Sequence, residues 1–469
     1  MIPHWNILNE RFLGWVGGIG FYWFLLTGFW GQDGHLVALG LIFLFFLYWI
    51  APNWRLIRAS SLFWLALCYS GYVALRAAAG YWADPGSLSW QLRFGWAFIG
   101  FGGLLSVFLL PWLIGSWRQK RLDRAFALVL VSLFIQVLLE LLVHSNGISF
   151  SQLLNSRPGF QMGPNSFGYI CGILLLGTVA LGVRWLRGTK AKFPWPRTLA
   201  YGVVLMVVMG LLTAGLLLSQ SRASWLATAV TLPFVILVTL WVQGEGWRNR
   251  GWITSGVLGG ALLIGGGLIY SQWGLVEYRV FKESHTIRKL LSFDFSELPR
   301  GSIGNRILLW ETGISAFPER PVSGWSPGGV KGLIEARTPF HYKHLHNMPL
   351  QIAVALGGVG FFLFFGMVLI SSREVFKAIG TGRLPLEWGI FWLGALVFLA
   401  VEGLFDFPMH DKEVRFLLTL LGAVAMGVQL ERLRQERPAH WISRGTEKVT
   451  GSKARTFGSI PLRPRWLSS

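Results

Sequence analysis

The sequence is poor in charged residues and nearly devoid of cysteine. Charged residues make up 14% of its 469 positions, whereas a soluble protein carries about 25% in order to cover its surface. A protein whose entire surface faces water is therefore excluded. The 2 cysteines, Cys68 and Cys171, each lie in an apolar stretch away from any CxxC motif or Cys/His cluster. Neither a disulfide framework nor a zinc or redox site is therefore expected.

The sequence also lacks the motifs of several enzyme and transporter classes. It contains no Walker motif and no GxGxxG motif in a dinucleotide-binding context, which excludes an ATP-driven pump within this chain. A cleavable signal peptide is not expected either. The first apolar stretch, 12–30, is long enough to span a bilayer, and no small-residue cleavage pattern follows it.

Apolar residues dominate what is present. They account for 53% of the chain, the mean hydropathy is +0.50, and there are 25 Trp and 35 Phe. About twenty apolar residues cross the hydrocarbon core of a bilayer. The pattern predicts an all-α, polytopic membrane protein with about twelve transmembrane helices. The predicted spans are 12–30, 36–51, 61–80, 95–116, 125–144, 165–186, 198–218, 223–243, 252–271, 347–370, 388–406 and 413–430.

The distribution of basic residues orients these helices. On a soluble protein the net charge of +20 would indicate a nucleic-acid partner. Here we interpret it as loop charge, and no nucleic-acid partner is expected. Seventeen Lys and Arg residues lie in the N-terminal segment and in the short loops on its side, against five in the short loops on the other side. The positive-inside rule then places both termini in the cytoplasm.

The spans divide the chain into four regions. Residues 1–271 are predicted to hold nine transmembrane helices, and 347–430 the last three. Between them, 272–346 is a large external, periplasmic loop, of a length that is usually functional, in which Ile307 to Ala316 is predicted to form an amphipathic helix on the membrane surface. The basic tail, 431–469, is expected to be disordered and to lie against anionic membrane lipid.

Three arginines on the external side are exceptions to the positive-inside rule, so a structural or functional reason is sought for each. Arg222 lies in SQSRAS between two spans, where a cation either snorkels at the interface or binds an anion at the outer face. Arg157 lies in NSRPGFQMGPN, a turn whose backbone N–H groups are also suited to an anion. Arg306 lies in GNRILLW, at the start of the amphipathic segment.

His344 and His346 lie where the long loop re-enters the membrane. Their H-x-H spacing is a weak signal for a metal site, and no carboxylate lies nearby in sequence. His346 stands beside Asn347, where it is interpreted either as a proton acceptor or as an interfacial structural histidine. Glu402 and Asp406 lie at the outer end of a later span, and they are candidates to pair with an external arginine or to relay a proton.

The order of several short motifs resembles the O-antigen ligase/polymerase superfamily of bacterial envelope glycosyltransferases. Each motif is short, but their order and their placement among the spans make the combination specific. They cover most of residues 145–411. The motifs are RPGFQMGPNSFGYI, LLLSQSRASWLA, GNRILLWETGISAFPERPVSGWSPGG, HLHNMPLQIAVALGGVG and LFDFPMH.

The resemblance implies a reaction at the periplasmic face of the bacterial inner membrane. Such enzymes transfer a glycan from undecaprenyl pyrophosphate to an acceptor hydroxyl on lipid A-core, on a growing glycan or on a protein. Neither a metal nor a cofactor is implied. By motif, Arg222 and Arg306 are expected to bind the pyrophosphate and His346 to act on the acceptor hydroxyl. The additional substrate-binding candidates are Arg157, Arg300 and Asn347.

The sequence leaves two alternatives to the preferred O-antigen ligase of lipopolysaccharide biosynthesis. One is an O-antigen or exopolysaccharide polymerase of the same superfamily, which has no decisive sequence difference here. The other is a transporter, which often has twelve helices with both termini inside. A transporter, however, places ionisable residues near the bilayer midplane, and only Arg76 and Glu140 are candidates for that position.

Overall fold

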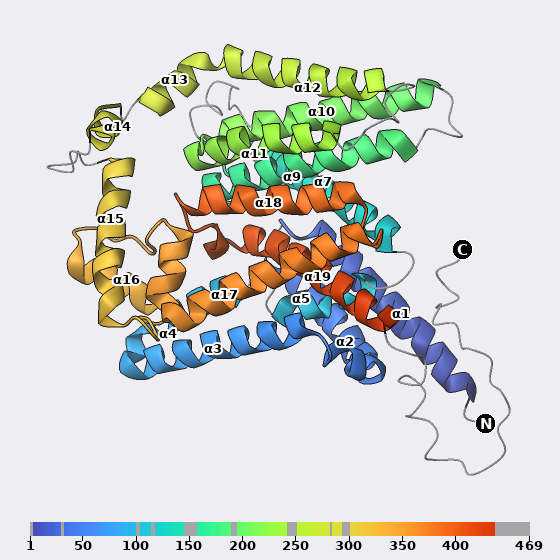
Figure 1. Cartoon of the computed structure of the whole chain (residues 1–469), viewed down its shortest axis with the longest axis horizontal. Coiled ribbons are helices and arrows are strands. Elements are labelled where there is room, and N and C mark those ends of the chain that lie inside the picture. The colour runs from blue at the N-terminus through green and yellow to red at the C-terminus, as the bar shows by residue number, and fades with distance from the viewer. Residues whose placement is uncertain are drawn as a thin grey trace, which may run out of the picture.

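The computed structural model describes an all-helical chain (Figure 1), and no β-strand occurs in the residues that it describes. The turns and loops in these residues connect helices or cap their ends. The described residues are 3–29, 32–99, 104–113, 118–144, 157–188, 195–241, 251–281, 284–292 and 301–436.

Nine helices in the described residues are long and apolar enough to cross a membrane. This confirms a polytopic, all-α membrane protein, and each of the nine overlaps a predicted span. α19 ends at Glu436 rather than near residue 430, and the rest of the predicted basic tail lies outside the described residues. The nine are α2 (Gln32–Ile57), α3 (Ser61–Ala83), α7 (Arg118–His144), α9 (Pro164–Gly188), α10 (Trp195–Ser219), α11 (Arg222–Trp241), α17 (Met348–Gly380), α18 (Leu386–Gly403) and α19 (Lys412–Glu436).

The other three predicted spans have different outcomes. Helices α1 (Pro3–Leu26) and α12 (Gly251–Ser271) occupy the first and ninth predicted ranges. The predicted continuous span at 95–116 is wrong, because the described residues there form separate short helices. A turn at Leu109 divides the described residues of this range, and Pro111, a residue type that is poor in helix interiors, lies just after it. The short helices are α4 (Leu88–Ile99), α5 (Leu104–Phe108) and α6 (Leu110–Leu113).

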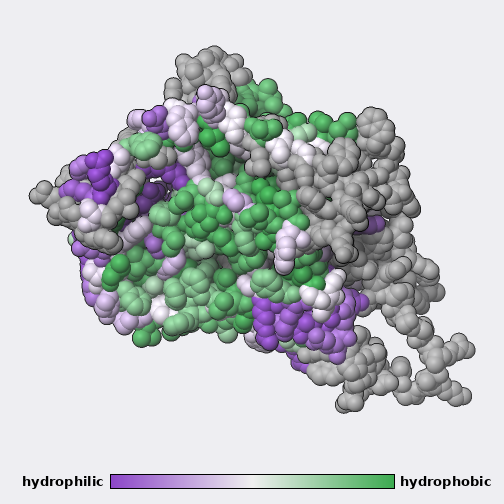
Figure 2. All heavy atoms as spheres, turned by 45° about the horizontal axis from the view of Figure 1, so that its top comes forward, coloured by the Kyte–Doolittle hydropathy of each residue, from purple (hydrophilic) through white to green (hydrophobic). Residues whose placement is uncertain are grey.

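The surface of the bundle is suited to lipid. Figure 2 shows a broad hydrophobic area between hydrophilic side chains at the end near α15 and others at the opposite end. Large apolar side chains such as Leu211, Leu237 and Phe362 are exposed on the long helices. Trp82 and Trp241 are exposed at the ends of α3 and α11, as expected of aromatic residues at a membrane–water interface.

Four short helices occupy the predicted external loop. They are α13 (Trp273–Phe281), α14 (Ser284–Leu291), α15 (Ser302–Ala316) and α16 (Gly329–Arg337). α15 contains the predicted amphipathic helix, and in Figure 1 it runs across the ends of the long helices. The amino-terminal end of α1 and the carboxyl-terminal end of α19 lie at the opposite end of the bundle. The two ends of the described chain therefore lie on one side and the short helices on the other.

The external loop docks into a break in α17. Gly357 has a φ of 66° and a ψ of −172°, which interrupts the helix. The amide of Gly358 donates to the carbonyl of Pro321 at 2.7 Å, and the amide of Trp325 donates to the carbonyl of Val354 at 2.8 Å. A break within a membrane helix needs partners for the backbone groups that it frees. The loop between α15 and α16 supplies them, and this fixes the loop against the bundle.

Candidate active site

The connection from α16 to α17 carries the histidines. Asn347 is the N-cap of α17, where its Oδ1 accepts from the amide of Leu350 at 2.9 Å. Its Nδ2 donates to the carbonyl of Leu404 at 3.1 Å, which ties the start of α17 to the α18–α19 connection. His346 has a φ of 50°. A side chain other than glycine in this region is held there by its surroundings, and such residues cluster at functional sites.

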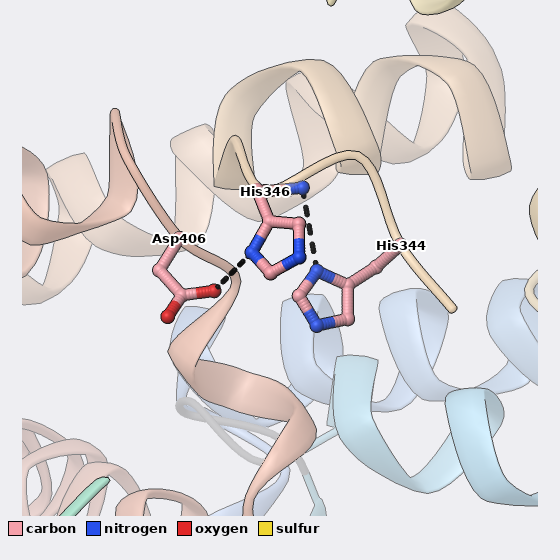
Figure 3. Close-up of side chains that lie close together, drawn as sticks. All are labelled: His344, His346 and Asp406. Atoms are coloured by element: carbon pink, nitrogen blue, oxygen red, sulfur yellow. Dashed lines mark hydrogen bonds and ion pairs between the residues drawn. The ribbon is translucent and has the colours of Figure 1, made fainter. Parts of the chain in front are cut away.

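His346 and Asp406 form a hydrogen-bonded pair. The Nδ1 atom of His346 lies 2.9 Å from Oδ1 of Asp406 (Figure 3). The side chains are 18% and 11% exposed, so the pair is shielded but reachable. An ionised carboxylate only accepts hydrogen bonds, so Nδ1 carries a proton, and in the neutral ring Nε2 therefore keeps its lone pair. That is the state in which an imidazole accepts a proton from a substrate.

The surroundings keep Asp406 ionised. Burial alone would raise the pKa of this carboxyl group. The hydrogen bond from His346 and the positive charges of neighbouring groups, Arg306 among them, outweigh burial and hold the pKa of Asp406 below its ordinary value. Asp406 therefore remains a carboxylate at neutral pH, and it favours the imidazole orientation described above.

Further hydrogen bonds connect Asp406 to the start of α9 and to the α10–α11 turn. Asp406 accepts from the amide of Phe407 at 2.8 Å and from Nδ2 of Asn165 at 2.7 Å. Oδ1 of Asn165 accepts from Nη2 of Arg157 at 2.7 Å, and Nε of Arg157 donates to the carbonyl of Ser219 at 3.1 Å. This chain joins the start of α9, the α10–α11 turn and the α18–α19 connection. The predicted arginine and histidine motifs therefore belong to one assembly.

Arg222 is the first residue of α11 and lies at the same turn. The turn also carries Ser221, which lies 2.9 Å from Ser224 between the hydroxyl oxygens. Ser224 donates to Oε1 of Glu402 at 3.2 Å, and Glu402 is buried. A helix amino terminus favours an anion. Arg222 adds a half-buried guanidinium at that terminus.

Arg306 approaches the pair from the external loop. It lies on α15, where its Nη1 donates to Oγ of Ser302 at 2.9 Å. Its charge is close enough to lower the pKa of Asp406. One turn further along α15, Nε1 of Trp310 donates to the carbonyl of His346 at 3.3 Å. α15 therefore brings a cation to the site and also contacts the backbone of the histidine.

The second histidine has a different environment. Nδ1 of His344 accepts from the amide of His346 at 3.3 Å (Figure 3). Desolvation and nearby positive charge lower the pKa of His344 well below its ordinary value, so the ring is neutral at neutral pH. One ligand atom each of His344, His346 and Asp406 lie within 4.8 Å of one another. No carboxylate lies near the H-x-H pair in sequence, but in the folded chain Asp406 reaches it from another helix connection.

The structure brings most of the predicted residues together. Arg157, His346 and Asn347 are linked through the α18–α19 connection, and Arg222 and Arg306 lie on helices that reach the same region. Arg300 lies outside the described residues, so its predicted role stays a prediction. Sequence reasoning missed Asn165 and Trp310 as partners of the site, although the motif RPGFQMGPNSFGYI contains Asn165 and the motif GNRILLW contains Trp310.

The fold and the site define a multi-pass membrane protein with a histidine–carboxylate pair and several arginines at one membrane face. Residues 203–365 match the family described as O-antigen ligase. This match confirms the predicted resemblance to that family over these residues. No curated protein matches the sequence. The matched segment contains Arg222, Arg306 and His346, whereas Asp406 and Asn165 lie beyond it.

Proposed function

We propose that the protein is a glycosyltransferase that moves a glycan from undecaprenyl pyrophosphate to an acceptor hydroxyl, and that it acts as an O-antigen ligase with lipid A-core as the acceptor. The observation that carries the proposal is the hydrogen bond between His346 and Asp406 at the face of the bundle where Arg222 and Arg306 also lie. The match of residues 203–365 to the O-antigen ligase family supports a lipid-linked glycan as the donor.

His346 acts as the general base in this proposal. Its Nε2 takes the proton of the acceptor hydroxyl while the hydroxyl oxygen forms a bond to the anomeric carbon of the donor. The bond from that carbon to the pyrophosphate oxygen breaks, and its electron pair leaves with the lipid pyrophosphate. Because attack and departure occur on opposite faces, the anomeric configuration inverts. Asp406 holds the ring and stabilises the imidazolium that forms.

The arginines stabilise the leaving group. The charge that develops on the pyrophosphate requires cations and hydrogen-bond donors placed in advance, and a guanidinium presents donors that match phosphate oxygens. Arg222 at the start of α11 and Arg306 on α15 approach the site from two sides. Arg157 is bonded to Asn165 and to the Ser219 carbonyl, so we assign it mainly a positioning role.

The remaining assignments follow from this reaction. The donor is already activated, so no nucleotide is consumed, and the proposed chemistry uses protein side chains without a metal or cofactor. Arg300 and Asn347 remain proposed substrate-binding residues, and Asn347 also fixes the start of α17. We place the site on the periplasmic face of the bacterial inner membrane with both chain termini in the cytoplasm, as the loop charges favour.

A polymerase of the same family is the second candidate, because it needs the same donor and the same site. A transporter is less favoured. Nη2 of Arg76, one of the two charged residues predicted near the midplane, donates to the carbonyl of Gly324 at 2.9 Å and so anchors the external loop. That structural use leaves less reason to assign Arg76 to a transport pathway.

Analysis of the envelope glycan in a deletion strain separates these functions. A ligase predicts lipid A-core without polymer and accumulation of the polymer on its lipid carrier. A polymerase predicts a single repeat unit on the core. Complementation with the wild-type chain should restore the glycan, whereas the His346→Ala chain at equal abundance should not. An unchanged envelope glycan in the deletion strain would contradict both functions.

A further inference from the structure

Figure 3 shows the ring of His346 between Asp406 and His344, with one ring nitrogen turned toward each neighbour. Nδ1 of His346 is bonded to Asp406, so its Nε2 carries a lone pair on the side of His344. Nδ1 of His344 is unprotonated, and its lone pair accepts a 3.3 Å hydrogen bond from the amide of His346 that an ion bound there would replace. Two imidazole acceptors thus lie together, with ring centroids 4.2 Å apart.

A third imidazole lies beside this pair. The ring centroid of His410 is 5.6 Å from that of His344. The side chain of His410 is 9% exposed, and its buried Nε2 has no hydrogen-bond partner among the described residues. A buried polar atom without a partner is costly and needs an explanation. Nδ1 of His410 lies 3.5 Å from Oδ1 of Asp411, so in the neutral ring the proton belongs on Nδ1, and the Nε2 lone pair makes His410 a further candidate ligand beside the pair.

The donor set is typical of a transition-metal site. Neutral imidazole is a preferred ligand of Zn²⁺, and a metal-bound histidine commonly donates its other ring N–H to a carboxylate, as His346 does to Asp406. Ligand atoms around a tetrahedral Zn²⁺ lie roughly 3.4 Å apart. One ligand atom each of His344, His346 and Asp406 lie within 4.8 Å of one another, which is close to this spacing.

We propose that His344 and His346 bind one transition-metal ion through imidazole nitrogens, with Asp406 accepting the hydrogen bond from Nδ1 of His346, that Zn²⁺ is the probe of choice, and that the bound ion inhibits glycan transfer. Inhibition follows because the ion occupies the Nε2 lone pair that His346 needs as a base. This consequence rests on the proposed function, whereas binding of the ion does not. The positive charge of Arg306 opposes the ion, and the carboxylate of Asp406 favours it.

A zinc titration of the purified protein tests the site without reference to activity. The chain carries no polyhistidine tag, is stripped with EDTA in detergent, and competes for Zn²⁺ with a chromogenic chelator. We expect one tightly bound ion per chain. His344→Ala and His346→Ala should each weaken binding at least tenfold, and Asp406→Asn by roughly tenfold to a hundredfold. Gel filtration and thermal unfolding show which variants remain folded, and His344→Gln serves as a milder second variant.

Two further variants make the titration specific. His341→Ala removes an exposed histidine of the same connection and should bind zinc as the wild type does. Arg306→Gln removes the opposing charge and should bind zinc more tightly. The proposal is overturned if His344→Ala and His344→Gln bind zinc as the wild type does, or if His341→Ala loses as much affinity as His344→Ala.

A transfer assay tests inhibition separately. Added Zn²⁺ should lower transfer by the wild type, EDTA should restore it, and His344→Gln should be much less sensitive at the same concentration. Equal sensitivity of the two proteins, or a rise in transfer on adding Zn²⁺, would contradict the inhibitory role. A wild type that binds zinc but transfers no glycan under any condition would refute the proposed function and leave the metal site intact.

Discussion

At the scale of single residues, the orientation of the proposed base depends on three contacts. Asp406 binds the ring of His346, the indole N–H of Trp310 donates to the carbonyl of His346, and the next residue, Asn347, is fixed as the N-cap of α17. These contacts hold His346 in a left-handed backbone conformation. The orientation of the imidazole is therefore set before any substrate arrives, which is the condition for efficient general-base catalysis.

Asp406→Asn tests this orientation directly. The amide can donate to Nδ1 of His346, which would favour the tautomer whose Nε2 carries a proton and cannot act as a base. We expect transfer to fall by roughly a hundredfold to ten-thousandfold while donor binding persists. Single-turnover transfer measures the loss of rate, and a donor-binding titration checks that donor binding persists. Asp84→Asn changes an exposed aspartate and should have no effect. Transfer within about threefold of wild type in Asp406→Asn would contradict the role of the pair.

The two arginines should affect the chemical step in the same direction. Arg222→Ala and Arg306→Ala each remove charge stabilisation at the leaving pyrophosphate, worth on the order of 3 kcal/mol, or roughly a hundredfold in rate. Lysine should restore only part of the rate, since an ammonium lacks the guanidinium fork. Arg337→Ala on the same external loop is the control, because that side chain pairs with Glu319 at the surface. Wild-type turnover in both alanine variants would contradict the pyrophosphate role.

The sequence indicated the proposed reactive residues more readily than their hydrogen-bond partners. His346, Arg222 and Arg306 lie in short motifs whose chemistry is readable, and the family match confirms the family to which those motifs belong. Asn165 and Asp406 are 241 positions apart and still share a hydrogen bond. No local pattern specifies such a pairing, because it depends on how α9 packs against the α18–α19 connection.

At the scale of elements, the break in α17 holds the external loop in place. Gly357 and Gly324 both have a positive φ, and their backbones face each other across the break. A Cβ atom on Gly324 would lie 2.5 Å from the carbonyl group of Ala355. Trp325 adds hydrogen bonds from its backbone amide to Val354 and from its indole nitrogen to Ala316. The start of α17, which carries Asn347, thus depends on this junction.

Gly324→Ala should therefore damage both stability and transfer. The added methyl group meets backbone atoms that cannot move aside, and the positive φ adds strain of order 1 kcal/mol or more. We expect a lower unfolding temperature in detergent and reduced transfer. Gly366→Ala on α17 has open space at its Cβ position and should leave both unchanged. Equal unfolding temperatures for the two variants would contradict the proposed importance of the junction.

Helix positions were largely predictable, whereas their interruptions were not. Long apolar runs marked the nine helices that meet the length and composition of a membrane span. Hydropathy averages over a window, however, and it therefore joined α4, α5 and α6 into one predicted span. The break in α17 was not predicted for the same reason. Glycine is common in membrane helices, and the φ of Gly357 is set by the loop that docks there.

At the scale of the whole molecule, the site-bearing end of the bundle is opposite the two ends of the described chain. We predict that the site-bearing end is periplasmic. In a Cys68→Ala, Cys171→Ala background, a cysteine at Ser292, exposed after α14, should label in intact cells with an impermeant thiol reagent. A cysteine at Ser452 should label only after the membrane is permeabilised. The reverse pattern would contradict the orientation and the periplasmic site.

The central claim is that His346 removes the proton of the acceptor hydroxyl. The most direct measurement is single-turnover transfer by purified protein from a lipid-pyrophosphate-linked glycan to its acceptor, with the anomeric configuration of the product determined by NMR. We predict an inverted product from the wild type. His346→Ala should lose roughly 10²–10⁴ in rate while it retains donor binding, and His341→Ala should transfer at a near-normal rate. A retained anomeric configuration, or a His346→Ala enzyme that keeps wild-type turnover, would contradict it.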